Sequence, residues 1–218
     1  MRLGIFGGTF DPIHLGHLRL AEEVGEGFDL DKVYLIPAAS PPHKGGKAVT
    51  AFHHRFEMAK LAVEGSTLLA AFDLEARRQG VSYSIETLKE FHRLYPSPLE
   101  LFFILGMDAF QEIETWKSYR ELFDYAHFVV VQRPGIAAGK MEERLFSLGV
   151  PFRRQDENRF VGPSGYQVIP MEATLMDISS TGIREKAAAG KSIRYLVPES
   201  VRCYILQYGL YNKTNGIS

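Results

Sequence analysis

The 218-residue sequence has a single cysteine, no long apolar run and almost no net charge. That cysteine, Cys203, excludes an internal disulfide and any paired-cysteine metal or redox motif. No apolar run approaches the roughly 18 residues that a membrane-spanning helix needs. The start of the chain meets glycines almost at once and lacks the apolar stretch of a signal peptide. We therefore expect a cytoplasmic protein with no membrane partner.

Neither sign of charge is in excess. The sequence has 25 Lys and Arg against 26 Asp and Glu, which gives a formal net charge of -1. Proteins that bulk charge holds to nucleic acid are strongly basic. We therefore expect no nucleic-acid partner. The composition leaves the oligomeric state open, a homo-oligomer included.

Short apolar runs alternate with longer amphipathic stretches along the chain. The runs predict strands at Leu3–Phe6, Val33–Pro37, Leu68–Leu74, Leu99–Leu105, His127–Val131 and Tyr166–Pro170. The amphipathic stretches predict helices at 15–27, 50–64, 84–95, 117–125, 140–149, 180–190 and 198–208. This alternation predicts an α/β fold with a doubly wound, Rossmann-like parallel sheet and helices on both faces. We expect one domain over residues 1–218, in which 171–218 form a C-terminal helical segment.

The first candidate site is the stretch GGTFDPIHLGH, which follows the first predicted strand. Gly7 and Gly8 let a ligand approach the backbone closely, and the next helix offers free N–H groups and a positive dipole end. His14 and His17 are three residues apart, so they share one side of a helical turn and can donate to phosphate oxygens. The weaker alternative is an ordinary helix start capped by Asp11, with the histidines on the surface.

Zinc is a weaker candidate for the two histidines. The sequence has no H-E-x-x-H motif, and a helix N-terminus disfavours a cation. We assign no metal ligand in the chain.

The second candidate site is ISSTGIR, which begins a predicted helix. Ser179 or Ser180 is a natural N-cap. Arg184 lies in the first turn, where a cation opposes the helix dipole, and an anion bound at the same terminus would relieve that conflict. The alternative is a capped surface helix with a solvated Arg184.

Four further residues lie near predicted strand ends, where ligands bind in doubly wound sheets. Lys44 could meet a phosphate or be solvated, and Arg133 could neutralise an acid or simply begin a turn. Asp108, which follows Gly106, could accept a bond from a sugar hydroxyl or cap a short helix. Trp116, the only tryptophan, could stack on a ligand ring or fill the core.

The string GGTFDPIHxGH, with ISSTxIR, resembles the nucleotidyltransferase superfamily that carries the HxGH motif, and most of all its bacterial nicotinate-nucleotide adenylyltransferases. The resemblance implies transfer of an adenylyl group from ATP to nicotinate mononucleotide. The products are nicotinate adenine dinucleotide, an intermediate of NAD biosynthesis, and pyrophosphate. It further implies Mg²⁺ bound mainly through substrate phosphates.

The resemblance also implies roles for individual residues. The catalytic residues would be His14, His17, Lys44 and Arg184. The ATP-binding residues would be Gly7, Gly8, Thr9, Phe10, His17, Gly106, Asp108, Ser179, Ser180, Thr181 and Arg184. The residues that bind the mononucleotide would be Lys44, Ser84, Trp116 and Arg133. Ser84 stands where the family usually has threonine, so the hydroxyl that would hold the nicotinate carboxylate is kept and a methyl group is lost.

Three other functions remain open at this point. One is the same fold with another acceptor, phosphopantetheine or nicotinamide mononucleotide. Another is a tRNA-binding relative of class I aminoacyl-tRNA synthetases, whose HIGH motif resembles His14–His17, although this chain is near-neutral and has no KMSKS segment. The third is a nucleotide-binding module without activity.

Overall fold

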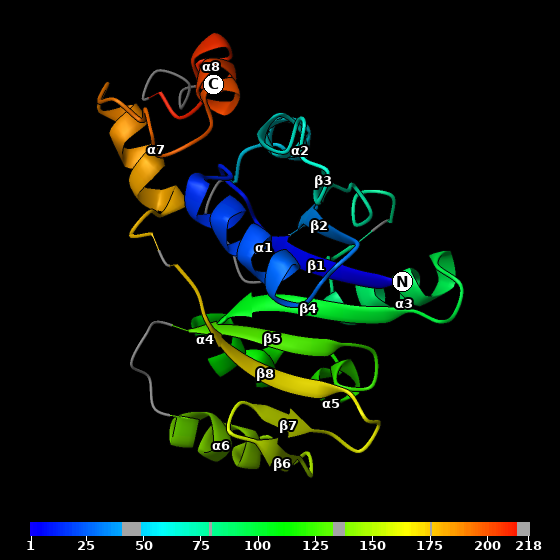
Figure 1. Ribbon diagram of the computed structural model, residues 1–218. Helices are drawn as coiled ribbons and strands as arrows, with labels where there is room; N and C mark the ends of the chain where they lie inside the picture. Colours follow the sequence, from blue (N-terminus) through cyan, green and yellow to red (C-terminus); the bar gives the residue numbers. More distant parts are fainter. Residues whose placement is uncertain (41–48, 79, 133–137, 175, 213–218) are drawn as a thin grey trace.

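The computed structural model describes residues 1–218 except 41–48, 79, 133–137, 175 and 213–218, and the side chains of 138–140 (Figure 1). The strands are β1 (Arg2–Gly8), β2 (Lys32–Pro37), β3 (Leu69–Ala71), β4 (Glu100–Gly106), β5 (His127–Gln132), β6 (Arg153–Asp156), β7 (Arg159–Val161) and β8 (Gln167–Glu172). The α-helices are α1 (Leu15–Gly27), α2 (Phe52–Ala62), α3 (Ser84–Leu94), α4 (Met107–Gln111), α5 (Tyr119–Leu122), α6 (Ala138–Ser147), α7 (Ser180–Ala188) and α8 (Glu199–Gln207).

The strands form one sheet in the order β3-β2-β1-β4-β5-β8-β7-β6, parallel from β3 to β8. The order reverses between β1 and β4, so the crevice beyond their carboxyl ends is where a ligand is expected in such a sheet. The predicted doubly wound α/β fold is confirmed.

Alternate residues of the central strands pack against two helical layers. Phe102 and Ile104 of β4 belong to a core that includes residues of α1, α2, α7 and α8. Phe103 and Leu105 point to the other face and pack in a core with residues of α3, α4, α5 and α6. Because successive side chains of a strand point to opposite faces, a continuous apolar run such as β4 is required when both faces are covered.

The edge formed by β6 and β7 was not predicted. The two strands pair antiparallel with each other, and β7 pairs antiparallel with β8. All four residues of β6 are exposed, and three of them are charged. The strand therefore lacks the kind of apolar run from which strands were predicted elsewhere in the chain. Such charges are typical of edge strands, which they protect from pairing with another chain.

Other boundaries also differ from the prediction. The predicted strand Leu68–Leu74 shortens to β3, and the predicted helix 117–125 shortens to α5. The five-residue helix α4 was missed because it is too short to show a helical period.

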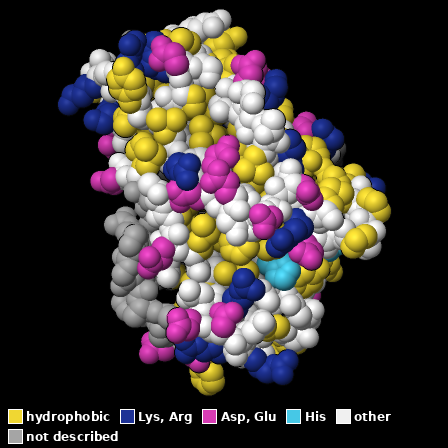
Figure 2. Space-filling view, viewed as in Figure 1, with side chains coloured by type: hydrophobic (Ala, Val, Ile, Leu, Met, Phe, Trp, Pro, Cys, Tyr) yellow, Lys and Arg dark blue, Asp and Glu magenta, His cyan; other side chains and the backbone are white. Residues whose placement is uncertain are grey.

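The C-terminal helices α7 and α8 lie together at one end of the molecule (orange and red in Figure 1). Ile183 of α7 and Val201 of α8 are buried in the same core as α1 and α2. The single domain over 1–218 stays a prediction. In the part of the chain that the structure describes, no helix is long and apolar enough to cross a bilayer. Lys and Arg are interspersed with Asp and Glu over most of the face in Figure 2.

Candidate active site

The loop between β1 and α1 is braced by a buried carboxylate. Asp11 is 2% exposed and accepts hydrogen bonds from the Thr50 backbone N–H (3.2 Å) and from the Tyr211 hydroxyl (2.8 Å). Burial and the neighbouring Asp11 raise the pKa of Tyr211, so its hydroxyl remains a donor. The N-cap of α1 is His14, so the alternative in which Asp11 caps that helix is wrong.

His14 and His17 lie against each other at the start of α1. Their rings stack with centroids 3.6 Å apart and an interplanar angle of 20°. The backbone N–H of His14 donates to Nδ1 of His17 at 3.2 Å. In a neutral imidazole the other nitrogen then carries the proton, so Nε2 of His17 is a hydrogen-bond donor. His14 is buried, and its Nδ1 has no hydrogen-bond partner among the described residues.

The surroundings leave these rings little freedom. The His17 ring meets Phe10 edge to face at 5.0 Å and Phe6 at 6.0 Å. Phe10 itself has a left-handed backbone with φ of 47°. A Cβ atom at Gly16 would lie 3.2 Å from Nδ1 of His14. The missing side chain at Gly16 therefore leaves room for the imidazole of His14.

Both imidazoles are neutral near pH 7. Burial lowers the pKa of His14 to about 4. Burial, and secondarily the charge of His14, lower the pKa of His17 well below its usual range. A bound polyphosphate would favour the protonated forms because opposite charges attract.

The buried His14 predicts that stability falls as the pH falls. The pKa of His14 is lower in the folded chain than its ordinary value of 6.5, so between about pH 6.5 and 4 the unfolded chain binds more protons. The stabilisation is complete above pH 6.5 and is lost toward pH 4. We expect the unfolding free energy to drop by on the order of 1–2 kcal/mol more between pH 7 and pH 5 in the wild type than in His14→Gln. Urea unfolding at both pH values measures this, and equal losses would contradict it.

The second motif touches the first. Ser180 Oγ donates to the Pro12 carbonyl at 2.9 Å, and Arg184 Nη1 donates to the Asp11 carbonyl at 2.6 Å. The alternative of a simply solvated Arg184 is therefore wrong. The serine contact joins two segments that are 168 residues apart in sequence. The start of α7 therefore packs against the loop that leads to the histidines.

Within the second motif, Ser179 is the N-cap of α7, and its Oγ accepts from the Gly182 N–H at 3.1 Å. Thr181 Oγ1 accepts from Arg184 Nη2 at 3.1 Å. The guanidinium is therefore held in place by Thr181 and by the first loop.

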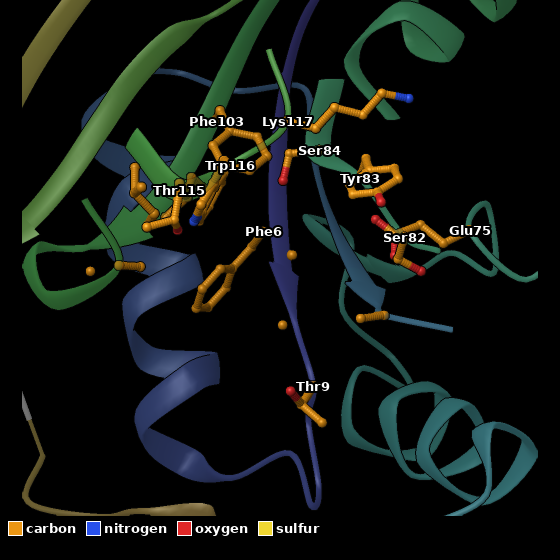
Figure 3. A pocket seen from close by; sticks show the side chains of 17 residues that line it. Phe6, Thr9, Glu75, Ser82, Tyr83, Ser84, Phe103, Thr115, Trp116 and Lys117 are labelled. Carbon is orange, nitrogen blue, oxygen red and sulfur yellow. The ribbon is translucent and has the colours of Figure 1, made fainter. Parts of the chain in front are cut away.

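A cavity of about 260 Å³ opens at the switch point of the sheet, next to the first loop (Figure 3). Six of the predicted residues line it: Gly7, Gly8, Thr9, Ser84, Gly106 and Trp116. They come from the ends of β1 and β4, the start of α3 and the segment before α5. The tertiary structure thus gathers residues that the sequence scatters over more than half the chain.

Trp116 is half-buried in the wall of this cavity. Its ring meets Phe103 edge to face at 6.1 Å. Ser84 is the first residue of α3, and Gly106 is the N-cap of α4. Asp108 is exposed and lies in the first turn of α4, so the alternative in which it caps that helix is wrong.

Some predicted residues cannot be placed, and others were missed. Lys44 and Arg133 lie outside the described residues, so their roles stay predictions. Glu75 and Lys117 line the cavity but were not predicted. Glu75 directly follows the predicted strand Leu68–Leu74, so the rule of strand carboxyl ends could have found it.

Within the described ranges, no group of three or more His, Cys, Asp or Glu side chains could hold a metal ion. Magnesium bound through substrate phosphates would not need such a group, and its presence stays a prediction.

Comparison with known proteins identifies the family of this chain. Residues 5–186 match the cytidylyltransferase-like family. The chain is 46% identical over 214 residues to a protein of Geotalea uraniireducens named as a probable nicotinate-nucleotide adenylyltransferase, with 97% and 99% of the two chains covered. A protein of Desulfatibacillum aliphaticivorans with the same name is 47% identical over 225 residues, with 97% of this chain and 100% of the other covered.

Solved structures agree in fold. The nicotinic acid mononucleotide adenylyltransferase of Plasmodium falciparum, complexed with NaAD, superposes with a TM-score of 0.72 at 20% identity and covers 96% of this chain and 97% of its own. Its complex with APC gives a TM-score of 0.70 at 20% identity, with 96% of each chain covered. The chain therefore belongs to the cytidylyltransferase-like family and, within it, to the nicotinate-nucleotide adenylyltransferases.

Proposed function

We propose that this chain transfers the adenylyl group of ATP to the 5′-phosphate of nicotinate mononucleotide, releasing pyrophosphate and forming nicotinate adenine dinucleotide. The observation that carries the proposal is that the GGTFDPIHLGH and ISSTGIR motifs touch each other beside a cavity that Trp116 lines. The family membership supports the reaction class.

The polyphosphate would lie where the start of α1 meets the start of α7. There His17 offers Nε2–H, and Ser179, Thr181 and Arg184 offer polar groups at a helix N-terminus. Ser180 and one Arg184 nitrogen bond the first loop instead, so they position it as well.

The nucleophile is a phosphate oxygen that is already an anion, so no general base is needed. Catalysis then consists of alignment and of stabilising the charge that builds on the α- and leaving phosphates. The imidazoles of His14 and His17 would donate to those oxygens. Mg²⁺, when bound to the phosphates, would neutralise part of the same charge. Lys44 and Arg133 are proposed to meet the acceptor's acidic groups.

The mononucleotide would occupy the cavity, with its pyridine ring against Trp116 and its carboxylate at the Ser84 hydroxyl. A pyridine ring packed on a half-buried Trp would be stabilised both by the apolar area that is buried and by the favourable arrangement of the two rings. The start of α3 at Ser84 adds free backbone N–H groups, which suit a carboxylate.

Removing the Trp116 ring should weaken binding of the acceptor more than that of ATP. We expect Trp116→Ala to raise KM for nicotinate mononucleotide roughly tenfold, because stacking energy and apolar burial are lost together. Trp116→Phe should recover part of the loss. Phe146→Ala, at an 89%-exposed aromatic of α6, is the control and should change neither KM. An equal rise in KM for ATP would contradict the placement.

Pyrophosphate release tests the function itself. ATP is supplied with nicotinate mononucleotide, nicotinamide mononucleotide or phosphopantetheine, and pyrophosphate is measured by a coupled assay. We expect the highest kcat/KM with the nicotinate compound. Release with only phosphopantetheine would change the substrate assignment, and no release with any acceptor would overturn the proposed function.

A further inference from the structure

One wall of the cavity contains a buried carboxylate that the proposed reaction does not yet use. Glu75 lines the cavity, is 9% exposed and has an Oε2 atom without a hydrogen-bond partner among the described residues. In Figure 3, Glu75 and Trp116 lie on opposite sides of the cavity. A ligand against Trp116 would therefore have Glu75 across from it.

The other carboxylate oxygen is held from behind. Thr87 Oγ1 donates to Glu75 Oε1 at 2.9 Å, and Arg78 Nη2 donates to the same Thr87 oxygen at 2.7 Å. Thr87 is 2% exposed and lies in α3. This chain of bonds fixes the carboxylate through one oxygen and leaves the other available.

Leaving a buried carboxylate oxygen without a donor is unfavourable. Hydrophobic residues such as Phe6, Phe103 and Leu105 form much of the cavity wall, so a bound ligand is the natural source of the missing donor. Nicotinate mononucleotide has a carboxylate and a phosphate, which Glu75 would repel. Its neutral hydrogen-bond donors are the two ribose hydroxyls.

We propose that Glu75 binds the mononucleotide by accepting a hydrogen bond from a ribose hydroxyl at Oε2. This inference rests on the proposed function, since it takes the occupant of the cavity to be a ribosyl mononucleotide. Glu75 thereby selects acceptors that carry a sugar hydroxyl at this position.

The test couples a change in the protein to a change in the ligand. Dissociation constants are measured by calorimetry for nicotinate mononucleotide and for its 2′-deoxy and 3′-deoxy analogues, with wild type, Glu75→Ala and Glu75→Gln. We expect one deoxy analogue to bind the wild type about 10-fold or more weakly than the parent, as is usual for a lost bond to a charged group. In Glu75→Ala that ratio should fall to about 1, because the partner of the hydroxyl is absent.

Glu75→Gln preserves the shape of the side chain and guards against a folding defect in the alanine variant. Its ratio should lie between those of wild type and Glu75→Ala, because a neutral acceptor forms a weaker bond. Glu90→Gln, at a surface glutamate of α3 that pairs with Arg93, is the matched control and should keep the wild-type ratio.

Several outcomes overturn the inference. One is a Glu75→Ala variant with the wild-type ratio of the dissociation constants of deoxy analogue and parent. This includes the case in which all three ligands bind more weakly by the same factor, as expected if the carboxylate only balances the pyridinium charge. Another is a coupling that appears with 2′-deoxy-ATP instead of the mononucleotide. Wild-type turnover of nicotinate mononucleotide is measured in parallel. Turnover without coupling refutes only the role of Glu75, whereas a wild type that neither binds nor converts the mononucleotide refutes the proposed function as well.

Discussion

Replacing His17 with alanine is expected to lower kcat for adenylyl transfer by about 10²–10³-fold, the usual effect of removing a donor that stabilises transition-state charge. The reason is geometric. Nδ1 of His17 accepts from the His14 backbone N–H, so in the neutral ring Nε2 carries the proton and is a donor, and Phe10 packs against the ring at 5.0 Å. Single-turnover measurement of pyrophosphate release gives the chemical step directly.

Two conservative variants separate catalysis from helix capping. His17→Asn keeps an acceptor near the Nδ1 position, so it can preserve the bond from the His14 N–H but places nothing at the Nε2 position. His17→Gln reaches the Nε2 position with its amide N–H. We expect Gln to recover more activity than Asn at similar stability. A near-wild-type kcat in His17→Ala would remove this residue from the mechanism.

The second large effect is expected at Arg55, which is 1% exposed. Its Nε donates to the Thr50 carbonyl and its Nη1 to the Thr9 carbonyl, both at 2.8 Å. Arg55→Met would deprive the carbonyls of two half-buried residues of their donor. At about 1–3 kcal/mol for each such acceptor, we expect a loss of roughly 2–6 kcal/mol in unfolding free energy. Urea unfolding, followed by the fluorescence of Trp116, measures it.

The nearby Lys60→Met provides the control for Arg55→Met. Lys60 lies in the same helix, but its side chain is 50% exposed, pairs with Glu57 at the surface and lies over the Phe56 ring. Such a substitution changes stability by no more than about 0.5 kcal/mol. Because Thr9 lines the cavity, Arg55→Met should also raise KM for the mononucleotide under conditions where the variant is folded. An Arg55→Met protein as stable as Lys60→Met would contradict the bracing role.

The parallel part of the sheet could be predicted because each of its main strands is a compact apolar run. The run Leu101–Leu105 is buried along its whole length, so its composition alone reveals a strand covered on both faces. The hairpin β6–β7 could not be predicted, because β6 buries none of its side chains and its position depends on pairing through the backbone.

The two motifs proposed to bind phosphate were visible for a similar reason. Each is contiguous, so its glycines, histidines or hydroxyls and the helix that follows can be recognised within a few residues of one another. The role of Ser180 was less accessible. Its hydroxyl bonds the Pro12 carbonyl 168 residues away, whereas Ser179 caps α7.

Local residue patterns were thus sufficient for the class of fold, the two candidate motifs and the family resemblance, because these depend on neighbours along the chain. Contacts between distant segments decided which groups support the site. Tyr211 bonds Asp11 across 200 residues, Arg55 reaches Thr9, and Glu75 faces Trp116 across the cavity. A buried polar group has a function only through the partner that folding brings to it, and no spacing within the chain specifies that partner.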